Sequence, residues 1–221
     1  MPHSDATINA RTWDQIASTM RTEADAVSWL FRTAPGPGLE ILGDLDGTTV
    51  AELGCGHGTR LARLTQLGIH RGIGIDVSPT RIHTAMTKHQ DDRLEWWLGD
   101  ACTITARLPE LDVAYSMFGA LWFADPHQIL PALHTRLRPG GRLVFSCLAR
   151  QPGTPEGRRA HLVRNGPGRQ LLTVRWMYSI DGWVRILTDH GYRIDHVHQP
   201  NDKINRHWGS AIFRAIRPAG R

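Results

Sequence analysis

The sequence places three glycines and a carboxylate at a spacing that could bind a nucleotide-like ligand. Gly54, Gly56 and Gly58 interrupt the apolar run in "VAELGCGHGTRLARL". A glycine in an ordered element costs about 0.5–1 kcal/mol relative to alanine, so three together indicate an unusual turn or a ligand against the backbone. Asp76 follows about 20 residues after Gly56, where a doubly wound fold places the carboxylate that binds ribose hydroxyls.

The glycine loop fits a dinucleotide-binding fingerprint only in part. Gly54 and Gly56 begin the pattern GxGxxG, but its third position falls on Thr59, and a glycine stands one residue early, at Gly58. The chain has no GKS or GKT tripeptide, which excludes a phosphate-binding P-loop. A nucleotide-dependent oxidoreductase is therefore an alternative enzyme class.

Three side chains beside the glycines have a structural reading as well as a chemical one. Glu52 either braces the loop or contacts the ligand, and the two readings have equal weight. Cys55 is expected to pack under the loop as a small residue. His57 has no second His, Asp or Glu at ligand spacing, so no metal site is predicted. The three cysteines form no CxxC pair, which favours reduced thiols.

The elements that would hold these residues alternate between strand and helix. Ser78 followed by Pro79, and Asp125 followed by Pro126, are helix-start signals, and Thr59 is an expected helix cap. Strands are predicted over 49–53, 73–76, 94–98, 111–116, a stretch ending near 147, 192–198 and 208–217, and helices over 60–66, 79–90, from 126, and 180–190.

This alternation predicts an α/β fold with a doubly wound, mostly parallel seven-stranded sheet and a C-terminal antiparallel hairpin. A chain of 221 residues, 41% hydrophobic, suits one domain over 1–221. An N-terminal cap of two helices is expected over 1–45 and a cofactor-binding core over 46–147. A substrate-side loop or cap without clear periodicity is expected over 148–178, and a terminal helix with the hairpin over 179–221.

Four motifs, in order, resemble the class I S-adenosylmethionine-dependent methyltransferase family, and most closely its small-molecule members. They are "ELGCGHG", "GIGIDVS", "WLGDA" and "LRPGGRLVFS". The resemblance implies a Rossmann-like methyltransferase fold and S-adenosyl-L-methionine as the cofactor. The segment "YSMFGALWFADP" departs from relatives that carry a histidine pair at Ala120 to Trp122, and it lacks the [DN]PPY tetrapeptide of amino-methylating DNA enzymes.

The resemblance also implies roles for individual residues. Asp76 would accept both ribose hydroxyl protons, and Asp100 would accept from the adenine amine, beside Ala101. Aromatic rings at Trp13, Phe118 and Trp122 would surround the sulfonium methyl, with core packing as the alternative. The expected cofactor-binding residues are Trp13, Glu52, Gly54, Cys55, Gly56, Asp76, Val77, Asp100, Ala101, Ser116 and Phe118.

The substrate side carries fewer signals. Nothing forms a recognisable acid–base pair, and His161 and His207 are the candidate catalytic residues by position alone. The arginine-rich segment 150–175 leaves the fifth strand, and its Arg164 and Arg169, together with Trp122, are the expected substrate-binding residues. Arginine suits carboxylates and phosphates, so we expect a small-molecule acceptor that is anionic or an intermediate of secondary metabolism.

Charge and hydropathy bear on partners. The net charge of +5 comes almost entirely from arginine, which admits a basic nucleic-acid-binding module as a non-catalytic alternative. The missing [DN]PPY motif argues against nucleic acid. No apolar run approaches the ~20 residues that span a bilayer and the first residues lack a signal-peptide pattern, so a cytoplasmic protein without membrane contact is expected. No oligomeric state is predicted.

Overall fold

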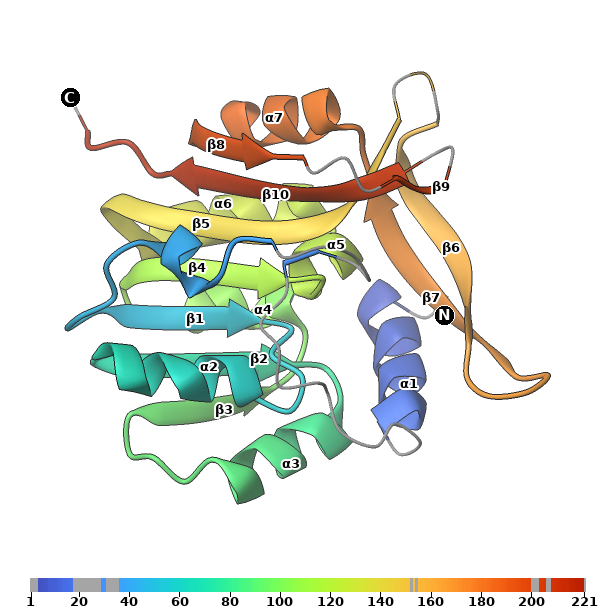
Figure 1. Ribbon diagram of the computed structural model, residues 1–221, viewed down its shortest axis with the longest axis horizontal. Coiled ribbons are helices and arrows are strands. Elements are labelled where there is room, and N and C mark those ends of the chain that lie inside the picture. The colour runs from blue at the N-terminus through green and yellow to red at the C-terminus, as the bar shows by residue number, and fades with distance from the viewer. Residues whose placement is uncertain are drawn as a thin grey trace.

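The computed structural model describes residues 4–17, 29–30, 36–151, 153, 155–199, 203–205 and 208–220. A central sheet carries helices on both faces (Figure 1). Its strands are β1 Thr49–Leu53, β2 Arg71–Asp76, β3 Leu94–Leu98, β4 Leu111–Met117, β5 Leu137–Arg150, β8 Arg193–His198, β9 Lys203–Asn205 and β10 Trp208–Ile216. The helices are α1 Asp5–Ala17, α2 Thr59–Leu64, α3 Pro79–Lys88, α4 Ala101–Ile104, α5 Ala120–Phe123, α6 Pro126–Arg136 and α7 Ile180–Asp189.

The strand order is β3-β2-β1-β4-β5-β10-β8, with β9 paired to β10. Strands β1 to β5 pair in parallel, and β10 runs antiparallel to both β5 and β8. The mostly parallel sheet of seven strands with an antiparallel C-terminal hairpin is therefore confirmed, and the short β9 is added to it. Parallel strands end at the same edge, so the loops after β1, β2, β3 and β4 gather there.

Two hydrophobic cores cover the faces of the sheet. The core on one face includes Leu130 of α6 and Trp183 of α7. The opposite core includes Leu61 of α2, together with Trp29 and with Leu42 of the 3₁₀-helix Leu39–Leu42. The central strands β1 and β4 are therefore buried along almost their whole length.

Local signals explain the helix starts. Ser78 accepts from the amide of Arg81 and caps α3, with Pro79 at the first helical position. Asp125 caps α6 in the same way. The expected cap at Thr59 is wrong by one residue, because α2 begins after Gly58 with a φ of 78°. A Cβ at Gly58 would lie 2.4 Å from the Trp96 ring, so only glycine fits.

The segment 148–178 is not the loop that its composition indicates. Strand β5 continues to Arg150, and β6 Gly157–Arg164 and β7 Gln170–Met177 form a separate two-stranded antiparallel sheet. Along β6 the half-buried positions include Arg159 and His161, whereas Leu162 is 63% exposed. Amphipathic strands usually bury their apolar residues and expose their polar ones, and β6 does the reverse. Its sequence pattern therefore does not predict a strand.

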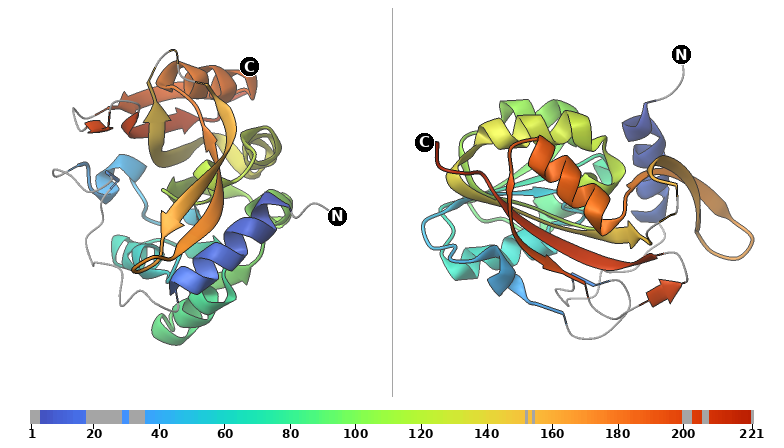
Figure 2. Two further views of the ribbon diagram at one scale, coloured as in Figure 1. Left: turned by 90° about the vertical axis from the view of Figure 1, so that its right-hand side faces the viewer. Right: turned by 90° about the horizontal axis from the view of Figure 1, so that it is seen from above.

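Helix α1 lies where the first of the two N-terminal helices was expected. Its axis runs beside the β6–β7 hairpin, at the edge where the parallel strands end (Figure 2). The second expected helix falls mostly outside the described residues, although Trp29 and Leu30 are described and are buried. Within the described ranges, no helix has both the length and the hydropathy needed to cross a membrane.

Candidate cofactor and active site

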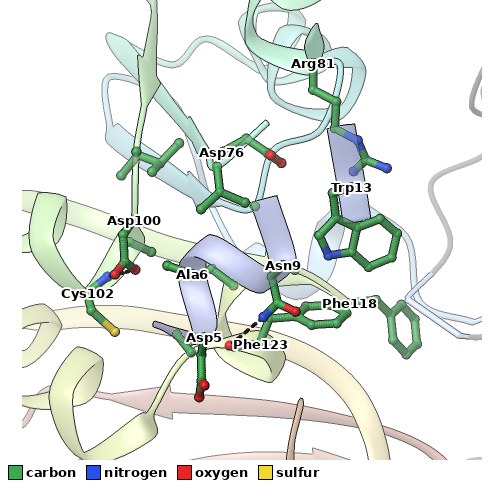
Figure 3. A pocket seen from close by; sticks show the side chains of 18 of the residues that line it. Asp5, Ala6, Asn9, Trp13, Asp76, Arg81, Asp100, Cys102, Phe118 and Phe123 are labelled. Carbon is green, nitrogen blue, oxygen red and sulfur yellow. Dashed lines mark hydrogen bonds between the residues drawn. The ribbon is translucent and has the colours of Figure 1, made fainter. Parts of the chain in front are cut away.

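The carboxyl ends of β1 to β4 open into a cavity of about 580 Å³ (Figure 3). This volume lies in the usual range for sites that bind small molecules and cofactors. The cavity collects residues from segments far apart in the sequence, from α1 to β7. Among its lining residues are the expected Trp13, Gly54, Asp76, Val77, Asp100, Ala101 and Phe118.

Gly54 ends β1 where two backbone segments come close together. Its φ is +80°, and a Cβ there would lie 2.6 Å from the amide nitrogen of Ala120 and 2.7 Å from Cα of Gly119. The amide of Gly54 donates to the carbonyl of Ile75 at 2.7 Å. A side chain would therefore push the start of α5 away, which explains the glycine without any ligand and leaves its backbone facing the cavity.

Asp76 is held by the backbone on both sides. Its Oδ2 accepts from the amide of Gly56 at 2.9 Å, and its Oδ1 accepts from the amide of Ser78 at 2.9 Å. The residue is only 6% exposed. A carboxylate has about four lone-pair sites, so each oxygen keeps acceptor capacity toward the cavity. The two amides fix the orientation of the carboxylate, and so the direction in which its remaining lone pairs point.

The end of β3 supplies a second carboxylate. Asp100 caps α4, and its Oδ1 accepts from the amide of Cys102 at 3.0 Å. Ala101 is buried beside it. Burial, followed by the charge of Asp100, raises the pKa of the Cys102 thiol to about 12. Cys102 is therefore protonated at neutral pH.

Phe118 follows β4 in a strained backbone conformation. Its φ is +47°, and it is the only non-glycine residue in the described part of the chain with a positive φ. Its amide donates to the carbonyl oxygen of Ser146 at 3.1 Å. Such conformations concentrate at functional sites because the surrounding structure must hold them. Phe118 lines the cavity (Figure 3).

Comparison with known proteins relates the central part of the chain and its fold to methyltransferases. Residues 51–145 match the family model described as a methyltransferase domain. The crystal structure of an S-adenosylmethionine dependent methyltransferase from Mesorhizobium loti shares the fold, with a TM-score of 0.61 at 19% identity over 80% of this chain and 94% of that one. The matched domain covers less than half of this chain, and the fold is the one seen in S-adenosylmethionine-dependent methyltransferases.

The chain spans only part of the length of the curated relatives that it matches. An uncharacterized 37.1 kDa protein of transposon Tn4556 from Streptomyces fradiae is 31% identical over 148 residues, covering 65% of this chain and 43% of that protein. An O-methyltransferase of Pyrenophora dematioidea is 26% identical over 179 residues, covering 79% and 62%. Neither alignment reaches two thirds of the relative's own length.

Four of the expected cofactor residues do not line the cavity. Glu52 is fully buried, with Oε1 3.1 Å from Nε of Arg60 and Oε2 accepting from the Tyr115 hydroxyl at 3.0 Å. Burial raises the pKa of the Cys55 thiol, whose side chain is buried under the loop. Gly56 holds Asp76. Ser116 donates to the carbonyl of Leu53 at 2.7 Å.

The expected substrate residues also lie outside the lining. Trp122 is buried, donates to Sδ of Met177 at 3.0 Å, and has Arg175 over its ring at 4.4 Å. Arg164 is exposed at the end of β6, and Arg169 donates to Gln15 at 2.9 Å.

Of the two histidine candidates, His161 does not line the cavity. His161 is half-buried on β6, and burial, followed by Arg175, lowers its pKa. His207 lies outside the described residues.

Several lining residues were not predicted from the sequence. Asn9 of α1 is buried, Phe123 packs edge-on against Trp13 with ring centroids 5.2 Å apart, and Trp176 comes from β7. Arg81 lies 4.9 Å from the Trp13 ring and occupies one face of it. The spacing of Asp5, Asn9 and Trp13 by four residues was the available signal, because it marks one face of a helix.

Proposed function

We propose that this protein is an S-adenosylmethionine-dependent methyltransferase that modifies a small molecule. The observation that carries the proposal is the convergence of Gly54, Asp76 and Asp100 on one cavity. A carboxylate with free acceptor capacity suits a ribose diol, a second carboxylate suits the adenine amine, and bare backbone suits the amino acid end of the cofactor. When bound, the cofactor supplies an electrophilic methyl group on a sulfonium.

The aromatic residues of the cavity suit that sulfonium. Phe118, Phe123 and Trp13 line the same wall, and ring faces attract cations. Trp13 already has Arg81 over its ring, so Phe118 is the better candidate for the contact. Methyl transfer is an in-line displacement, in which the protein contributes chiefly alignment and exclusion of water.

The acceptor is proposed to be small because the cavity has the volume of a small-molecule site and α1 forms one of its walls. A general base is required only if the acceptor must lose a proton. His161 and His207 are the candidates for that role from their places in the sequence, and His161 does not line the cavity. Arg164 and Arg169 do not line the cavity, so they would contact only a part of the acceptor that extends beyond it. An anionic acceptor remains a prediction.

Calorimetric titration with S-adenosylhomocysteine and with NAD(P) tests the cofactor assignment. We expect binding of S-adenosylhomocysteine and no heat from NAD(P). A preference for the dinucleotide would favour the oxidoreductase alternative, and salt-sensitive oligonucleotide affinity without cofactor binding would favour the nucleic-acid-binding alternative. Mass spectrometry of metabolite extracts incubated with the protein and a methyl-labelled cofactor then identifies the acceptor, and a labelled small molecule is the expected result.

A further inference from the structure

Helix α1 forms one wall of the cavity and is attached to the fold on two sides. Its residues Ala6, Asn9 and Trp13 line the cavity. The helix packs between α3 and β7, so it joins the cofactor half of the molecule to the β6–β7 hairpin (Figure 2). The attachments on the two sides differ in chemistry.

On the α3 side, Asp14 caps a helix that is not its own. Its Oδ1 accepts from the Ser78 hydroxyl at 2.9 Å and from the amide of Thr80 at 3.0 Å. Amides at a helix N-terminus stabilise a negative charge. Burial acts to raise the pKa of Asp14, but the hydrogen bonds from Thr80 and Ser78 and the nearby Arg81 outweigh it, so the pKa lies below its usual value.

A path of hydrogen bonds continues from Asp14 to the glycine loop. The amide of Ser78 donates to Oδ1 of Asp76, and the amide of Gly56 donates to Oδ2 of the same carboxylate. Asp14 therefore holds the turn that holds Asp76. Its position affects the carboxylate to which we assign the ribose hydroxyls.

On the β7 side, Asn9 pairs with a strand edge. Its Nδ2 donates to the carbonyls of Val174 at 3.0 Å and Phe123 at 3.2 Å, and its Oδ1 accepts from the amide of Val174 at 2.8 Å. The side chain is buried, so breaking these bonds leaves polar groups without water. Exposed contacts such as Asp5 with Arg158 add little by comparison.

We propose that α1 is a latch over the bound cofactor and that Asp14 is a positioning residue for Asp76. The latch slows release of the cofactor, because α1 must give up the Asn9 or the Asp14 attachment before that wall of the cavity opens. The proposal rests on the proposed function, since it takes the ligand of the cavity to be S-adenosylmethionine.

Stopped-flow measurement of S-adenosylhomocysteine release tests the latch. The variants are Asn9→Ala and Asp14→Ala, with Arg11→Ala as the matched control on the exposed side of the same helix. We expect release to be at least about tenfold faster in both test variants, from the loss of buried or charged hydrogen bonds, and within twofold of the parent in the control. Hydrogen exchange of the α1 amides should rise in parallel.

An analogue of S-adenosylhomocysteine without the ribose hydroxyls tests the positioning role. In the parent and in Asn9→Ala, the analogue should bind more weakly than S-adenosylhomocysteine by the same factor. In Asp14→Ala that factor should shrink toward one, because Asp76 is no longer oriented. An unchanged factor in Asp14→Ala would overturn the positioning role.

The outcomes separate this proposal from the proposed function. If the parent does not bind S-adenosylhomocysteine, both fall. If the parent binds it and release is unchanged in the test variants, the latch alone is wrong. Should Asn9→Ala fail to fold, as judged by its thermal transition, Asp14→Ala carries the same expectation for release and decides the matter.

Discussion

At the scale of single residues, the two carboxylates of the cavity differ in how firmly they are held. Asp76 accepts one backbone amide on each oxygen, whereas Asp100 accepts one amide in total among the hydrogen bonds of the described residues. The more constrained carboxylate suits the more demanding task, because two hydroxyl groups in a ribose require a fixed direction.

We predict that Asp76→Ala lowers the affinity for S-adenosylhomocysteine by roughly tenfold or more, because hydrogen bonds to a charged group contribute about 1.5–3 kcal/mol. Asp100→Ala should act in the same direction. Calorimetry measures both, and Asp92→Ala, at an exposed carboxylate, is the control. Parent-like affinity in Asp76→Ala would remove the ribose assignment.

Cys102 supports a second prediction at this scale. With its pKa at about 12, the thiolate at pH 8 is about a thousandfold scarcer than for a thiol of ordinary pKa, and higher nucleophilicity offsets only part of this. We expect iodoacetamide to modify it roughly thirtyfold more slowly than a free cysteine, with the rate rising as pH increases. Mass spectrometry measures the rate. Rapid labelling at pH 8 would contradict the burial of this side chain.

At the scale of elements, the site depends on the close approach of the β1 and β4 ends. We predict that Gly54→Ala destabilises the fold and abolishes S-adenosylhomocysteine binding, because its Cβ would overlap the Ala120 backbone. Gly140→Ala is the matched control, since φ there is +79° and nothing lies within 4 Å of the added Cβ. Both variants bear the left-handed strain of about 1–2 kcal/mol, and only Gly54→Ala adds the clash. Denaturant unfolding and calorimetry separate the two costs.

The β6–β7 hairpin gives a prediction about the acceptor. Arg164→Ala and Arg169→Ala should leave S-adenosylhomocysteine affinity unchanged, because neither side chain lines the cavity. If the acceptor is anionic, both should reduce the rate of methylation once an acceptor is known. Full methylation rates in both variants would remove the anionic hypothesis. Steady-state kinetics with the identified acceptor makes the measurement.

The elements that the sequence predicted well are those whose signals are local. Runs of apolar residues marked β1 to β4, and Ser78 with Pro79 marked the start of α3. The β6–β7 hairpin was not predicted because Arg159 and His161, which are polar, occupy half-buried positions of β6. The helical spacing could have placed Asn9 on the same face as Trp13, but not its hydrogen bonds, because its partners Phe123 and Val174 lie 114 and 165 residues away. Contacts at such separations have no local signature.

At the scale of the whole molecule, the cavity lies between two parts of the chain. One is the sheet edge, which the family model covers, and the other consists of α1 and the β6–β7 hairpin, which are additions outside it. The model spans residues 51–145, whereas α1 and the hairpin lie outside that range. The sheet edge contributes Gly54, Asp76 and Asp100, and the additions contribute Asn9 and Trp176. We therefore expect the core to set cofactor binding and the additions to set acceptor choice and cofactor release.

Because the cofactor would bind the folded state alone, it should stabilise the whole molecule. At a concentration 100 times the dissociation constant, S-adenosylhomocysteine should add about 2.7 kcal/mol. For a chain of this size, that corresponds to a rise in Tm of about 5–10 °C. At the same concentration Asp76→Ala, with affinity reduced tenfold, should show about half the rise, because the stabilisation depends on the logarithm of the concentration ratio. Differential scanning calorimetry measures the shift. NAD(P) should produce none, and an equal rise in parent and Asp76→Ala would mean that the ligand binds away from this cavity.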